Sequence, residues 1–301
     1  MKIGQLSTGE LLRQARAEGF CFTSGPFRIQ LRTPLRALVS TFQQLYGELP
    51  LEPPRGIRDF HLEVAPVPGI RRWWRPQAYF YLDGQRPFEP YPLAHAFPLF
   101  EWGLNYSMAL RAHQYCLLHS AVVERQGHAL VLPAMPGSGK STLCAALMLK
   151  GWRLLSDEFG IVLPNSGQLL PMPRAIPLKN ASIEVIRRFS SQGRLGPLFA
   201  GTRKGDVAHL APTAISLQRQ HEEAAPRWIL FPRYRQGSAT RLRPLARSQA
   251  FLRLSNNAFN YHLLGETAFV ALTRMVQACQ CYSFEYSNLD EAVEVLGALA
   301  P

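Results

Sequence analysis

The sequence predicts an α/β protein in which a small α+β module precedes a larger α/β domain. An apolar run at 129–132 reads as a buried strand, and it leads through a glycine-containing loop into a helix-forming run at 143–150. The first ~90 residues instead read as hairpins with one or two helices. We therefore predict two units, 1–92 and 93–301.

Composition supports a folded protein with a sizeable core. The chain has 301 residues, of which 47% are hydrophobic and 18% charged. We expect a cytoplasmic protein without a membrane span, because the start lacks the apolar core of a signal peptide and no apolar run approaches the ~20 residues that cross a bilayer. The five scattered cysteines favour buried free thiols. The net charge of +12 suggests acidic partners such as nucleotides, an acidic peptide or nucleic acid.

The predicted N-terminal module is built from short elements. Thr8 is the expected N-cap of the first helix. Gly25 and Pro26 form the turn of a hairpin, and Pro34 opens a helix that Gly47 closes. The expected elements are a helix at 8–18, a hairpin at 20–32, a helix at 35–47 and strands at 59–66 and 77–84.

Residues 71–75 form the most nucleic-acid-like cluster, because two tryptophans lie among three arginines. Such a cluster could stack on bases. The alternative, which we favour, is an amphipathic strand whose tryptophans pack inward or under the arginine side chains. Nucleic acid is therefore disfavoured as a partner.

The second unit alternates strands with helices. Asn288 is the expected N-cap of its last helix. The expected elements are a helix from about 95, strands within 117–127 and 152–164, short strands and turns at 164–180, a helix at 181–192, strands at 227–234 and 239–245, a helical region at 246–278, a strand at 281–287 and a helix at 289–299.

The loop after the strand at 129–132 has the pattern of a phosphate-binding loop, with a Lys-Ser pair opening the helix. Gly137 and Gly139 allow backbone N–H groups to converge on one anion, and the helix N-terminus adds positive potential. The motif wants glycine where Ala134 stands, so the loop must begin with ordinary backbone angles. The predicted phosphate-binding residues are Pro136, Gly137, Ser138, Gly139, Lys140, Ser141 and Thr142.

Two adjacent carboxylates, Asp157 and Glu158, end an apolar strand shortly after this loop. Burying unpaired charge is costly. A Mg²⁺ ion, or proton transfer from a hydroxyl group, would explain them. The basic loop at 201–206 is either a phosphate clamp or a plain hairpin turn.

Four features in this order resemble the HPr kinase/phosphorylase family over residues ~115–300. These are the strand with His119, Ser120 and Ala121, the loop ending GSGKS, the strand LLSDE, and the final strand CYSFEYS with helix LDEAVEVL. The stretches GTRKGDVAHLAP and PLKN and the separate N-terminal module are similar to the HPr-related kinase A group.

The resemblance implies an HPr-kinase and phosphoenolpyruvate-carboxykinase type of P-loop domain that uses ATP and Mg²⁺. Asp157 matches the catalytic aspartate and His119 a histidine beside it. Glu158 replaces a second aspartate, and we expect it to hold the metal with Ser141. Lys140 and Arg174 are expected to neutralise the phosphates. Lys179, Arg203 and Lys204 are carried over as further candidates.

The resemblance implies a kinase that transfers the γ-phosphate to serine in a peptide or small protein, an acceptor that we expect to be encoded beside the kinase gene. It also implies assembly into homo-oligomers. No clear equivalent of the phosphorolysis region is present, so kinase activity follows more directly than its reverse. Two alternatives stay open: a small-molecule kinase or carboxykinase-like enzyme of the same fold, and a nucleotide-binding regulatory module without catalysis.

Overall fold

The computed structural model describes residues 1–53, 55–69, 73–135 and 137–299. Pro136, Arg71 and Arg72, three residues singled out above, lie outside the described residues. The fold is α/β, as predicted, with three sheets. No helix in the described ranges is long and apolar enough to cross a membrane.

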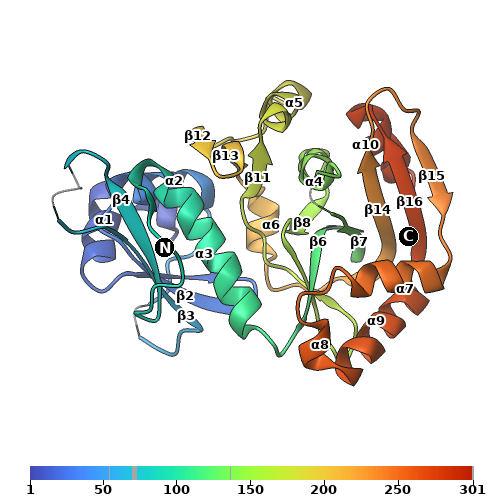
Figure 1. Cartoon of the computed structure of the whole chain (residues 1–301), viewed down its shortest axis with the longest axis horizontal. Helices are drawn as coiled ribbons and strands as arrows, with labels where there is room; N and C mark the ends of the chain where they lie inside the picture. Colours follow the sequence, from blue (N-terminus) through green and yellow to red (C-terminus); the bar gives the residue numbers. More distant parts are fainter. Residues whose placement is uncertain (54, 70–72, 136, 300–301) are drawn as a thin grey trace.

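The N-terminal region is a five-stranded sheet covered by helices (Figure 1). The first helix begins after Ser7, which accepts a hydrogen bond from the Glu10 amide, so the predicted N-cap Thr8 is wrong by one residue. The elements are α1 (Thr8–Arg16), β1 (Phe20–Ser24), β2 (Phe27–Arg32), α2 (Arg36–Tyr46), β3 (Phe60–Pro66), β4 (Gln77–Leu82), β5 (Tyr91–Pro92) and α3 (Ala96–Arg111), with short 3₁₀ turns at Ile3–Gln5 and Leu93–His95.

Helix α3 packs against β3 and β4, and its apolar side chains join the core of the N-terminal sheet. It lies between that sheet and the rest of the chain (Figure 1). The predicted boundary at residue 92 assigns α3 to the second unit, although α3 packs on strands β3 and β4 of the first. The same core also includes Phe159 and Met172 from the second unit, so the two regions share buried surface.

The second region is built on an eight-stranded sheet in the order β10-β9-β6-β7-β14-β16-β15, with β8 also paired to β6. Strands β7, β14 and β16 are parallel to one another. The strands are β6 (Cys116–Arg125), β7 (His128–Pro133), β8 (Arg153–Ser156), β9 (Phe159–Val162), β10 (Leu169–Leu170), β14 (Ala225–Tyr234), β15 (Arg241–Pro244) and β16 (Gln280–Tyr286).

Helices cover both faces of this sheet. Successive side chains of a strand point to opposite faces, so Leu130 and Leu132 of β7 pack under α4 and α10 whereas Ala129 and Val131 pack toward α7 and α9. This two-sided burial explains the continuous apolar run in the sequence. The helices are α4 (Lys140–Leu149), α5 (Ala181–Phe189), α6 (Ala214–Gln218), α7 (Arg247–Ser255), α8 (Tyr261–Leu264), α9 (Glu266–Ala278) and α10 (Leu289–Gly297).

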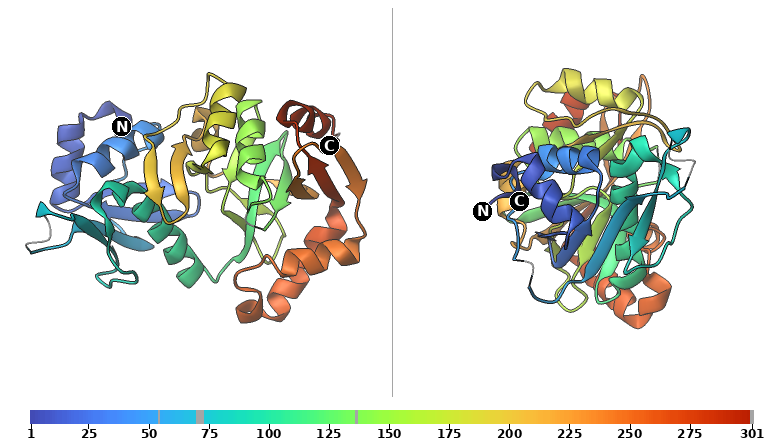
Figure 2. Two further views of the ribbon diagram at one scale, coloured as in Figure 1. Left: turned by 45° about the horizontal axis from the view of Figure 1, so that its top comes forward. Right: turned by 90° about the vertical axis from the view of Figure 1, so that its left-hand side faces the viewer.

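A three-stranded sheet lies between the two regions (Figure 2). Its strands are β11 (Ile176–Lys179), β12 (Phe199–Thr202) and β13 (Gly205–Leu210), in the order β11-β13-β12. The basic loop at 201–206 is the hairpin turn between β12 and β13. The Phe199 ring stacks on Phe97 of α3, with ring centroids 6.2 Å apart. This small sheet therefore holds the N-terminal region against the larger sheet.

The tryptophan cluster differs from the favoured interpretation. Residues 73–75 do not form a strand, and the Trp73 and Trp74 side chains are 79% and 82% exposed, so the prediction that they pack inward is wrong. The Arg75 guanidinium lies 5.3 Å from the centre of the Trp74 ring, which agrees with the other half of that interpretation, a tryptophan under an arginine side chain.

A buried ion pair joins β6 to β8. The Arg153 Nε donates to Glu124 Oε2, and both side chains are almost fully buried. Removing Glu124 as Glu124→Ala leaves the buried guanidinium without its counter-charge, so we expect the free energy of unfolding to fall by about 3–5 kcal/mol. Urea denaturation measures this change.

The matched control is Glu184→Ala. Glu184 pairs with Arg187 on α5, but both side chains are more than half exposed, and an exposed pair contributes less than about 1 kcal/mol. Equal losses in the two variants would contradict the buried pair's structural role.

Candidate functional site

The predicted phosphate loop joins β7 to α4. Ala134 is buried, and it is not among the described non-glycine residues with positive φ, which confirms the expectation of ordinary angles at the loop entrance. Gly137 and Gly139 have φ values of +85° and +86°. Lys140, Ser141 and Thr142 form the first turn of α4, and helix N-termini of this kind attract anions.

Two neighbouring strands support the back of the loop. The Tyr234 amide of β14 donates to the Ser138 carbonyl oxygen at 2.8 Å. The Tyr286 hydroxyl of β16 donates to the Gly139 carbonyl oxygen at 3.1 Å. A Cβ atom on Gly139 would lie 2.5 Å from that hydroxyl and 2.9 Å from Tyr234 Cβ. Glycine is thus required at 139 by both backbone angle and space.

The helix side of the loop is bonded to the predicted acidic pair. The Lys140 Nζ donates to the Asp157 backbone oxygen, and the Ser141 hydroxyl donates to Asp157 Oδ2 at 2.7 Å. Asp157 and Glu158 form the turn between β8 and β9. Lys140 and Ser141 precede Asp157 by 17 and 16 positions in the sequence, and they contact it at one site.

Asp157 is an unusual carboxylate. It is only 3% exposed, and its Oδ1 is buried without a hydrogen-bond partner among the described residues. Burial raises the pKa of Asp157 to about 6, and the charge of Glu158 also acts upward, although Lys140 and the Ser141 hydroxyl act in the opposite direction. A carboxylate with this pKa can accept a proton near neutral pH.

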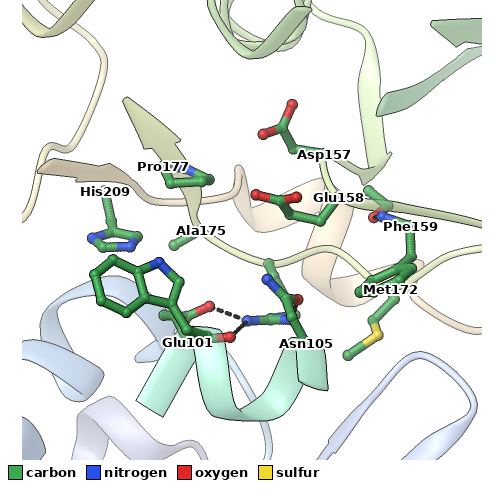
Figure 3. A pocket seen from close by; sticks show the side chains of 12 residues that line it. Glu101, Asn105, Asp157, Glu158, Phe159, Met172, Ala175, Pro177 and His209 are labelled. Carbon is green, nitrogen blue, oxygen red and sulfur yellow. Dashed lines mark hydrogen bonds and ion pairs between the residues drawn. The ribbon is translucent and has the colours of Figure 1, made fainter. Parts of the chain in front are cut away.

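Glu158 differs from its neighbour. Burial acts to raise the pKa of Glu158, but the charges of Lys140, Lys204 and Lys179 act in the opposite direction, and the pKa lies below its ordinary value. Glu158 is thus ionised at neutral pH. In Figure 3 its carboxylate lies between Asp157 and Asn105, toward the pocket that both acidic residues line.

His119 lies on β6, and its ring contacts Phe259 edge to face with centroids 5.5 Å apart. Burial lowers the pKa of His119, as does the charge of Lys140, while Glu158 offsets part of the fall. The imidazole is therefore neutral at pH 7. Its Nδ1 is buried without a partner in the part of the chain that the structure describes.

Arg174 lines the same pocket, but α3 holds its guanidinium. Its Nη2 donates to the Glu101 carboxylate and, at 2.9 Å, to the Glu101 backbone oxygen, while Nη1 donates to the Asn105 side chain. In Figure 3 Glu101 and Asn105 lie below the acidic pair, and dashed lines mark bonds of the Glu101 residue. Arg174 thus connects the pocket to the N-terminal region, and its charge is already paired.

Basic side chains border the pocket. Lys179 and Lys204 both act on the pKa of Glu158. The Lys204 ammonium lies 5.4 Å from the centre of the Trp102 ring, and the Arg203 guanidinium lies 4.4 Å from that of Tyr91. Cations over aromatic rings are stabilised by the ring quadrupole. The β12–β13 turn therefore carries two cations that contact the N-terminal region.

Sequence reasoning missed several pocket residues. Glu101, Trp102 and Asn105 come from α3, which lies more than 50 positions before the acidic pair. His209 lies on β13 against Phe97, and burial lowers its pKa to about 4. The sequence offered only a weak signal for His209, a polar residue inside an apolar run, and none for the α3 residues.

The described residues contain no group of three or more His, Cys, Asp and Glu side chains that could bind a metal ion. Mg²⁺ is commonly held by one or two carboxylates with substrate phosphates and water supplying the other oxygens. The oxygens of Ser141 and Glu158, with the unpartnered Asp157 Oδ1 nearby, suit that type of site.

No family model matches the chain. None of the curated proteins matches it either. The functional argument therefore depends on the chemistry of this site.

Gly139→Ala should destabilise the protein more than Gly137→Ala. Both residues have positive φ, which costs a residue with a Cβ about 1–2 kcal/mol, but only at 139 would the Cβ meet other atoms within 4 Å. Urea denaturation of the two variants compares them directly. A Gly139→Ala protein as stable as Gly137→Ala would contradict the packing of Tyr234 and Tyr286 on the loop.

Asp157→Asn should stabilise the ligand-free protein above about pH 6. Because the pKa of Asp157 is raised on folding, its contribution to stability is complete below its unfolded value near 3.8 and is lost as pH rises through about 6. The asparagine variant does not suffer that loss, which amounts to about 3 kcal/mol. Denaturation from pH 3.5 to 8 measures it, with a change of the exposed Asp290 on α10, Asp290→Asn, as control. A pH-independent difference would contradict the buried charge.

Proposed function

We propose that the chain is an ATP-dependent serine kinase acting on a peptide or small protein. The observation that carries the proposal is the bonding of the phosphate loop's helix to a buried carboxylate with a raised pKa. A phosphate-binding loop alone is consistent with any nucleotide-binding protein. A proton acceptor beside it is what transfer to a hydroxyl group requires.

In this proposal the amides of the loop at 137–141 and the Lys140 ammonium bind the β- and γ-phosphates. Their positive charges would stabilise the negative charge that develops during transfer. Ser141 and Glu158 would hold Mg²⁺, which when bound neutralises phosphate oxygens.

Asp157 would orient the acceptor serine and take its proton. The serine oxygen forms a bond to the γ-phosphorus as the bond to the β,γ-bridging oxygen breaks, and ADP leaves with the electron pair. The neutral His119 lies beside the ionised Glu158. It would keep that side of the pocket polar without acting as a general acid. Arg174, whose charge is paired with Glu101, would shape the pocket floor.

The small-molecule alternative stays open, because the same loop and proton acceptor would serve any hydroxyl group. A regulatory module without catalysis leaves the buried Asp157 unexplained.

The finer assignments belong to the same proposal. They are the HPr-kinase and phosphoenolpyruvate-carboxykinase type of fold, membership of the HPr-related kinase A group, a cytoplasmic location and an acceptor encoded nearby. Assembly into homo-oligomers also stays a prediction.

The test is transfer of labelled phosphate from ATP–Mg²⁺ to small proteins encoded beside the gene, detected as phosphoserine. Asp157→Asn should lower the rate by about 10²–10⁴-fold, the usual contribution of a general base, while ATP binding is retained. Lys140→Ala should abolish transfer and weaken ATP binding. Asp290→Asn, at an exposed residue of α10, is the matched control.

A wild-type rate in Asp157→Asn would overturn the assignment of the base. A loop that binds no nucleotide in the wild-type protein would overturn the kinase proposal as a whole.

A further inference from the structure

A second concave surface lies on the larger sheet, away from the acidic pair. It has a volume of about 370 Å³ and is formed by β14, β15 and β16 with one residue from α7. These strands lie side by side at one end of the molecule, with β15 at the sheet edge (Figure 1). We call it the arginine groove; its charged residues are Arg233, Arg235, Arg241, Arg243, Arg253 and Glu285.

Strand register explains why the arginines gather. Arg241 and Arg243 of β15 lie opposite Glu285 and Ser283 of β16, and Arg233 of β14 lies opposite Glu285 from the other side. Residues directly opposite one another share a face of the sheet. The alternating arginines of two strands therefore converge on one face.

None of the five arginine side chains has a hydrogen bond or ion pair to another described residue, and all five are exposed. Glu285 is likewise unpaired within the described chain and supplies the groove's one negative charge. Like charges held this close repel one another. Guanidinium groups are well suited to bind carboxylates through two parallel hydrogen bonds, so the groove is complementary to an acidic ligand.

The groove adjoins the phosphate loop but faces the other way. Tyr234, between Arg233 and Arg235, donates its amide to Ser138 in the loop. Its side chain lies against Gly139 on the α4 side, so the two flanking arginines point to the α7 side of the sheet. Phosphates bound by the loop would leave the groove unoccupied.

The aromatic residues of the groove disfavour nucleic acid. The Arg253 guanidinium covers the Phe231 ring, with 5.4 Å between Cζ and the ring centre, and Phe284 is 1% exposed. Single-stranded nucleic acid is usually bound by stacking bases on exposed rings. The described lining residues offer charge but no such ring.

We propose that the arginine groove docks an acidic segment of the polypeptide that carries the acceptor serine. This inference rests on the proposed kinase function and adds a partner class to it. Acidic residues bound there would hold the acceptor beside the loop while its serine reaches Asp157.

Strand spacing sets the separation of the two points. Asp157 directly follows β8, which pairs with β6. The groove is centred on β16, and the order β8-β6-β7-β14-β16 spans four strand spacings. Four spacings are about 19 Å, and an extended chain advances about 3.3 Å per residue. Because the groove also faces the other side of the sheet, this separation is a minimum, and the acidic segment should lie about six or more residues from the serine.

The test uses a fluorescein-labelled peptide with one serine and four consecutive glutamates about six residues away, and fluorescence anisotropy without ATP. Arg241→Ala/Arg243→Ala should weaken binding by about tenfold or more, since each arginine can form charge-assisted bonds to a carboxylate. Arg13→Ala/Arg16→Ala, with the same charge change at two exposed residues of α1, should bind as wild type does. Arg235→Ala, directly after β14, tests the groove from a second segment.

The outcomes separate the groove from the kinase function. Equal binding by the groove and control variants would overturn the groove, as would displacement of the peptide by saturating ATP–Mg²⁺. Tighter binding of a single-stranded oligonucleotide, lost in the same variant, would also overturn it in favour of nucleic acid. Groove-dependent peptide binding without phosphorylation of any serine peptide would support the docking site and overturn the kinase function instead.

Discussion

The bonds between α4 and Asp157 determine how the rest of the site is arranged. Lys140 binds the backbone oxygen of Asp157 and Ser141 binds its carboxylate. The same two residues open the helix whose N-terminus faces the loop. Because both ends of this connection are buried, a movement of α4 would also move the β8–β9 turn. The phosphate loop and the acidic pair are thus one structural unit.

The N-terminal region is part of this unit. The Tyr46 hydroxyl of α2 donates to Glu101 of α3 at 2.8 Å and accepts from the Ala175 amide at 2.8 Å. Glu101 in turn binds Arg174. Each of these polar groups is buried and would be costly to leave unpaired. The pocket wall therefore depends on residues from both regions, which gives the N-terminal sheet a direct structural connection to the proposed chemistry.

Local patterns in the sequence predicted the elements well, because they depend on near neighbours. The loop, its helix, and the strand ending at Asp157 follow from periodicity, glycine positions and the cost of burying charge. Contacts between distant elements were not predictable in this way. The packing of α3 on the N-terminal sheet, the Arg174–Glu101 pair and the convergence of Arg233 with Arg241 each depend on strand order, which no local pattern specifies. The exposure of the Trp74 side chain was likewise not predictable from the local sequence pattern.

Charge balance constrains how the proposed site could work. Two adjacent carboxylates beside a phosphate loop would repel a bound nucleotide, and the phosphates would raise the pKa of Asp157 further. Lys140 and Lys179 act in the opposite direction on both carboxylates, and a Mg²⁺ ion held by Ser141 and Glu158 would add its positive charge to their effect. Binding of the metal would therefore favour the ionised form of Asp157 and offset the effect of the nucleotide phosphates. Under the proposed function, this coupling would make proton acceptance depend on a complete substrate complex.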